Sequence, residues 1–215
     1  MIERSWHVVD GDGRQLSTRR SSPTAALAVA PVVTLPLTVV GDDGSRMDLC
    51  QALGPGGERV AGMLDALFVG RAVDVEALAR ATPAGPIDLP LDTVTLPAAV
   101  EAAARVDPDW LAELDRRRTE CRRAVVEAGR ADALEAALHV AVVVATERFD
   151  PRDDGDVDEH VASGARLWLL AGAVVSALRG AHPDPFAAWG QLLTAGWWPV
   201  GPSDGRLVVT RRPVT

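Results

Sequence analysis

Residues 132–149 read DALEAALHVAVVVATERF, and this stretch decides the fold. Its apolar side chains do not form one stripe but surround the helix cylinder: Leu134, Leu138, Val140, Ala141, Val142, Val143 and Val144. A helix that is apolar on all sides is usually enclosed by other elements, so we expect a central, buried helix. Asp132, with Glu135 three residues later, matches a capping box and predicts where this helix begins.

A second long apolar helix is expected from about Asp156 to Arg179. Its apolar side chains leave little polar surface: Trp168, Leu169, Leu170, Val174, Val175 and Leu178. The strongly apolar run from Leu167 to Leu178 is too short for a bilayer core of about 30 Å, which argues against a membrane span. Because a short acidic loop separates the two helices, we predict that they pack as a central antiparallel pair.

Flanking helices carry their own start and stop signals. Asp107, with Pro108 at the first helical position and Gly129 at the end, predicts one helix. Asp184, Pro185 and Gly196 predict another in the same way. The helical spacing of apolar residues also predicts helices over 57–70 and 74–81.

Strand signals gather towards the two ends of the chain. Alternating or β-branched residues between glycine-rich turns predict strands at 5–9, 31–40, 197–200 and 206–210. We expect the hairpin at 197–210 to pair with the N-terminal strands in one small antiparallel or mixed sheet. The predicted fold class is therefore α+β and mainly helical, with a central antiparallel helix pair.

One domain is expected over residues 1–215, because this length suits a single hydrophobic core. Within it we distinguish a strand-rich part at 1–50, a helical part at 57–196 and the hairpin at 197–210. Residues 82–96 contain Pro83, Pro86 and Pro90 and predict an extended connector.

The net charge of −8 argues against nucleic acid and anionic membranes as partners. The one basic run, at 116–123, is interleaved with Glu113, Asp115 and Glu120, which predicts a salt-bridged helix face. Lysine, asparagine and tyrosine do not occur, a composition typical of a GC-rich bacterial genome. Cys50 and Cys121 stand alone, as is usual in a reducing compartment, so we expect a cytoplasmic protein.

The acidic loop at 150–159 is the sharpest local feature for cation binding. Asp150, Asp154, Asp156 and Asp158 are candidate metal ligands, at spacings that partly match a calcium loop. Arg152 and Val161 stand where ligands are required, so the alternative is a solvated turn. No cofactor motif is present in the sequence, and we expect no cofactor.

Candidate catalytic residues lie on the two central helices. Glu135 and His139 are four apart on the first, and Arg166 lies on the second as a possible anion clamp. A histidine on an apolar helix is more often a core residue with a satisfied hydrogen bond. The glutamate and histidine are also spaced one residue too far apart for the di-iron bundle pattern.

The adjacent tryptophans Trp197 and Trp198 are candidate interface residues. Neighbouring residues of a strand point to opposite faces, so one of the two indoles must face outward or towards a partner. Exposed tryptophan is common at protein interfaces.

These patterns favour a non-catalytic interaction, accessory or regulatory protein that binds a protein partner or forms a homodimer. The alternative is a small-molecule enzyme or ligand-binding protein with a pocket between the central helices and the sheet. The sequence names neither a substrate nor a partner.

Overall fold

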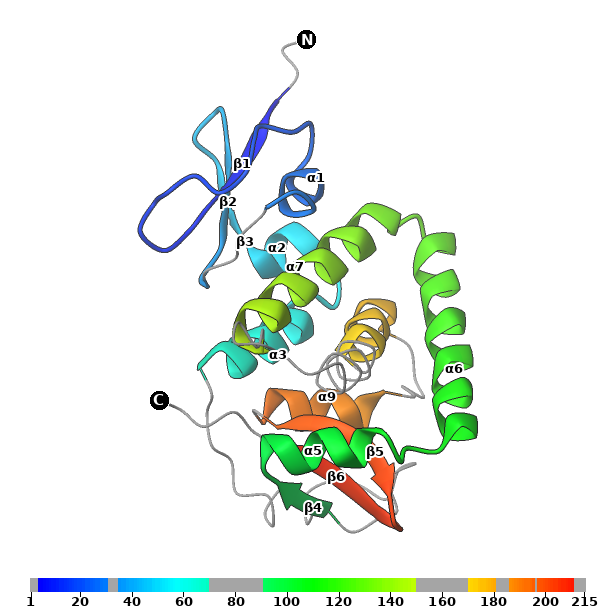
Figure 1. Cartoon of the computed structure of the whole chain (residues 1–215). Coiled ribbons are helices and arrows are strands. Elements are labelled where there is room, and N and C mark those ends of the chain that lie inside the picture. The colour runs from blue at the N-terminus through cyan, green and yellow to red at the C-terminus, as the bar shows by residue number, and fades with distance from the viewer. Residues whose placement is uncertain are drawn as a thin grey trace.

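Helices fill the space between two small sheets in the computed structural model (Figure 1). The structure describes residues 4–30, 35–69, 91–149, 170–180, 186–195 and 197–210. The prediction of a mainly helical α+β fold is confirmed. Among the described residues, no helix is long and apolar enough to cross a bilayer.

The elements follow one another along the chain with these bounds. The helices are α1 Pro23–Leu27, α2 Leu49–Leu53, α3 Gly57–Val69, α5 Leu96–Ala103, α6 Pro108–Glu127, α7 Ala131–Phe149 and α9 Ala187–Thr194. Residues 170–179 are also helical. The strands are β1 Trp6–Val9, β2 Thr38–Gly41, β3 Arg46–Asp48, β4 Leu91–Val94, β5 Trp198–Ser203 and β6 Arg206–Thr210.

The first sheet is antiparallel and has the order β1-β2-β3. Strand β1 pairs with β2, so that Val8 lies opposite Val39. On its other side β1 makes bridges to Gln15 and Arg20. Both sides of β1 are therefore occupied by the N-terminal segment itself.

The second sheet has the order β4-β6-β5. Strands β5 and β6 form the predicted hairpin, and its turn residues Asp204 and Gly205 both have positive φ, which suits the right-handed twist of the strands. Gly201 has a φ of +139°, and a Cβ there would lie 3.0 Å from the side chain of Val106. Glycine is thus required where β5 passes the residues that precede α6.

The prediction of one sheet shared by the N-terminal strands and the C-terminal hairpin is wrong. The third strand of the hairpin's sheet is β4, which lies within the predicted connector 82–96 and pairs parallel with β6. Two facts explain the difference. Strand β1 has no free side for the hairpin, and residues 91–94 contain β-branched Thr93 and Val94, which favour a strand.

Helix α7 has the central place that its sequence predicts, and it contacts α1, α2, α3 and α6. Its buried side chains are Ala133, Leu134, Ala136, Ala137, Val140, Ala141 and Val144. It begins at Ala131, so Asp132 lies inside the first turn, and the capping box predicted at Asp132 is wrong. A carboxylate in the first turn still complements the positive end of the helix dipole.

The second central helix is described only in part. Residues 170–179 are helical, and Leu170, Val174, Val175 and Leu178 are buried, as expected. The rest of the predicted helix lies outside the described residues, and the antiparallel pairing stays a prediction. The helix expected at 74–81 also lies outside them.

The ends of α6 and α9 test the start and stop residues that the sequence predicts. Asp107 caps α6, because its side chain accepts a hydrogen bond from the backbone N–H of Asp109 at 2.9 Å. Gly129, with a φ of +73°, follows the end of α6 as predicted. Helix α9 begins at Ala187 and has Phe186 at its cap position. Asp184 and Pro185, where the sequence predicts the start of this helix, lie outside the described residues.

Gly56 and Gly62 offer a matched test of the packing. Gly56 has a φ of +80°, and a Cβ there would lie 2.2 Å from the backbone oxygen of Ala177. We expect Gly56→Ala to lower the free energy of unfolding by more than about 2 kcal/mol, because strain and a backbone clash add together.

The control, Gly62→Ala, lies within α3 where no heavy atom would come within 4 Å of the new Cβ. It should raise stability by roughly 0.5–1 kcal/mol through helix propensity. Urea unfolding followed by circular dichroism measures both values. Equal effects of the two substitutions would contradict the close contact at Gly56.

Candidate functional site

His139 and Glu135 lie one turn apart on α7 but in different surroundings. Glu135 is exposed and His139 is half-buried. The Nε2 atom of His139 lies 2.8 Å from the backbone oxygen of Ala30, just after α1. Since a carbonyl oxygen only accepts, Nε2 carries the proton and donates this hydrogen bond. His139 therefore fastens the end of α1 to α7.

The structure does not join the predicted acid/base residues through hydrogen bonds in the described part of the chain. His139 contacts the backbone of another segment, Glu135 faces solvent, and Arg166 lies outside the described residues. With Nε2 engaged, Nδ1 is the nitrogen of the neutral imidazole that can accept a proton. The catalytic role of these three residues stays a prediction.

The predicted metal ligands Asp150, Asp154, Asp156 and Asp158 lie outside the described residues. Within the described ranges, no group of three or more histidine, cysteine, aspartate or glutamate side chains is arranged to hold a metal ion. Cation binding at the acidic loop stays a prediction.

The two candidate interface tryptophans lie at the start of β5. Trp197 is half-buried and packs against the main hydrophobic core, and its backbone N–H donates to the oxygen of Leu192 at 2.9 Å. Trp198 is the first residue of β5, which is an outer strand of the second sheet. The contact of Trp197 with the core indicates a structural role for that indole.

The junction of α1 and α7 carries exposed apolar side chains that sequence reasoning missed. Val142 is 43% exposed, although the sequence predicts it to be buried. Val29, which precedes the Ala30 that His139 binds, is 38% exposed. Leu138, which shares a face of α7 with Val142, is half-buried. We call these three side chains the α1–α7 surface.

Among the described residues, the neighbours of α7 leave Val142 partly uncovered, whereas Leu138, one turn earlier, packs against the main core. The exposed or half-buried positions Glu135, Leu138, His139 and Val142 recur at the spacing of one helical face. Residues 140–144 are all apolar and therefore lie on all sides of the helix. Their periodicity could not show which of these valines would be buried and which exposed.

Arg130, which sequence reasoning also missed, lies between α6 and α7. Its side chain joins this turn to two other segments, the end of α2 with the turn after it and the end of helix 170–179. Its guanidinium donates to the backbone oxygens of Leu178 at 2.7 Å, Leu53 at 3.0 Å and Pro55 at 2.6 Å. Leu53 is the last residue of α2, and Leu178 lies at the end of helix 170–179. A cation there complements the negative ends of both helices.

The same contact accounts for the glycine-rich turn at 54–57. The oxygen of Pro55 points to the Arg130 guanidinium, and Gly56 lies against the backbone of Ala177. The turn therefore presents an oxygen acceptor to a cation. The spacing of glycines in the sequence gives no signal for this, because the partner is 75 residues away.

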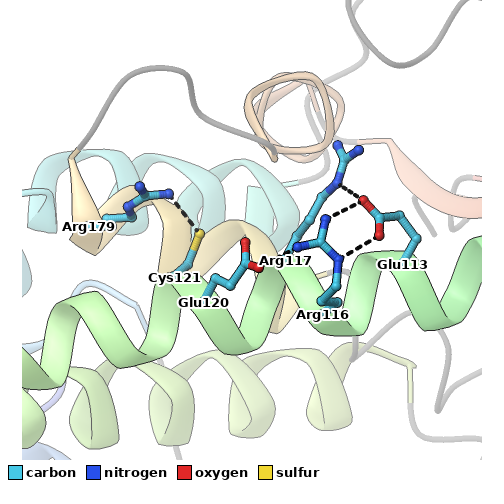
Figure 2. A network of polar contacts seen from close by, with 6 residues as sticks. All are labelled: Glu113, Arg116, Arg117, Glu120, Cys121 and Arg179. Atoms are coloured by element: carbon cyan, nitrogen blue, oxygen red, sulfur yellow. Dashed lines mark hydrogen bonds and ion pairs between the residues drawn. The ribbon is translucent and has the colours of Figure 1, made fainter.

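The first three arginines of the basic run, Arg116 to Arg118, form ion pairs on α6 as the sequence predicts, and Figure 2 shows those of Arg116 and Arg117 with Glu113. Glu113 receives hydrogen bonds from Arg116 at 2.8 Å and from Arg117 at 2.7 Å, and Arg116 also contacts Glu120. Arg118 pairs with Asp115 at 2.7 Å. The hydrogen bond from Arg116 contributes most, followed by that from Arg117, and together they lower the pKa of Glu113 to about 2. These arginines are neutralised on their own helix, which disfavours them as a phosphate-binding surface.

Both cysteines are free, as expected. Cys121 is fully buried on α6, and its Sγ lies 3.5 Å from Nη1 of Arg179 (Figure 2). Cys50 is half-buried on α2, and burial, reinforced by nearby Asp48, raises the pKa of its thiol. A raised pKa reduces the thiolate fraction, so Cys50 is a poor nucleophile.

Substitution of Arg130 tests the junction of the three segments. We expect Arg130→Ala to lower the free energy of unfolding by about 2–3 kcal/mol, because three carbonyl oxygens lose a charged donor. Arg130→Lys should recover only part of this loss, since one ammonium cannot reproduce the planar fork. Arg116→Ala is the control, and it should leave the urea midpoint nearly unchanged because its ion pairs are exposed. A loss for Arg130→Ala no larger than for the control would contradict the role of Arg130.

The ionisation of Glu113 tests the network on α6. Its pKa is lower in the folded chain than the ordinary value of 4.5, so its contribution to stability is present above about pH 4.5 and is lost as the pH falls towards 2. We expect carbon-detected NMR titration to show a pKa near 4.5 in Arg116→Gln combined with Arg117→Gln. Arg122→Gln, on the side of α6 opposite Glu113, should leave the value low. A pKa of 4.5 in the wild-type protein would rule out the network in solution.

Comparison with known proteins adds no relative to these observations. No protein-family model, curated protein or solved structure matches the chain.

Proposed function

We propose that this protein is a non-catalytic interaction protein of the cytoplasm, an accessory or regulatory subunit or a homodimer, and that it binds its partner through the α1–α7 surface. The observation that carries this proposal is the 43% exposure of Val142 on the central helix. A helix that is apolar on all sides is usually covered on all sides. A second protein would complete that cover.

The position of Val142 strengthens the proposal. One exposed valine on a surface needs no explanation. Here, however, Val142 lies one turn from His139, and His139 holds the segment that presents exposed Val29. The two exposed valines thus belong to two segments that the His139–Ala30 hydrogen bond joins. Protein interfaces combine apolar centres with polar rims. Exposed Glu135 supplies a polar group on the same face of α7.

The state of the catalytic candidates also supports a binding role. The half-buried His139 donates to a main-chain oxygen, and Glu135 is exposed. Among the described contacts, Glu135 and His139 are not hydrogen-bonded to each other, so they do not form the acid/base pair that the sequence suggests. The main-chain contact of His139 instead serves to hold α1 in place.

Two valines with similar exposure make a matched test of this surface. We expect Val142→Glu to abolish association, because a carboxylate would be buried without a partner in the interface. Val126→Glu is the control, since Val126 is 47% exposed but lies on α6. Both variants should keep the circular-dichroism spectrum of the folded wild-type protein. Light scattering after size exclusion, over a range of protein concentrations, measures the oligomeric state.

Affinity capture with the same three proteins tests a heterologous partner. If the wild-type protein is monomeric, it and Val126→Glu should retain a common protein that Val142→Glu does not retain. Equal association of both variants would contradict the α1–α7 surface. A wild-type protein that binds neither itself nor another protein would contradict the proposed function as a whole.

The tryptophan pair gives an independent test of the second candidate interface. We expect Trp197→Ala to lower stability by about 2–4 kcal/mol, because its indole packs on the core. Trp198→Ala should leave stability closer to the wild type and weaken association if this residue belongs to the interface. Thermal unfolding and light scattering separate the two effects. A loss of stability without a change in mass for Trp198→Ala would remove it as an interface residue.

A further inference from the structure

We draw no further inference here: the strongest candidate, the buried and unpartnered indole N–H of Trp189 on α9 beside Trp110, carries nothing because no described group identifies a ligand that would accept its hydrogen bond.

Discussion

The guanidinium of Arg130 holds together chain segments that are far apart in sequence. It lies in the short turn between α6 and α7 and binds the ends of α2 and of helix 170–179. Main-chain oxygens at a helix end have no partner within the helix, so a planar group with several N–H donors suits the place where such ends meet. Gly56 allows the backbones to approach closely enough for these bonds. Because Arg130 directly precedes Ala131, the first residue of α7, these bonds fix the position of the start of the central helix.

Helix α7 then divides into a covered and an uncovered side. Its covered side contributes to the main core, which includes residues from both sheets, such as Val39 and Val209. On its uncovered side, His139 fixes the end of α1, and Val142 remains exposed. The hydrogen bond of His139 to the main chain holds the segment after α1 against α7. Exposed Val142 therefore lies on a part of the surface that the fold keeps in place. Such a surface is suited to recognition, because little ordering is required when a partner binds.

Local signals in the sequence located several helix ends and turns, although the capping box expected at Asp132 is not formed. Asp107 and Gly129 mark the ends of α6, and the turn at Asp204 and Gly205 marks the hairpin, because capping and turn geometry depend on a few adjacent residues. Long-range pairing was not predictable in this way. The partner of β6 is β4, and the choice depends on which strand sides are already occupied. The roles of Arg130 and Val142 likewise depend on segments that only the folded chain brings together.

The parallel pairing of β4 with β6 also determines the order in which the protein can assemble. Thr210 donates its hydroxyl hydrogen to the backbone oxygen of Val94, a contact that spans 116 residues. The first sheet, by contrast, is complete once residue 48 has left the ribosome. Closing the longer loop costs more chain entropy and gains nothing until both strands are present. During synthesis, β4 and the face of α5 that packs on the second sheet therefore remain unpaired until β6 has been made, and an unpaired strand edge is prone to aggregation.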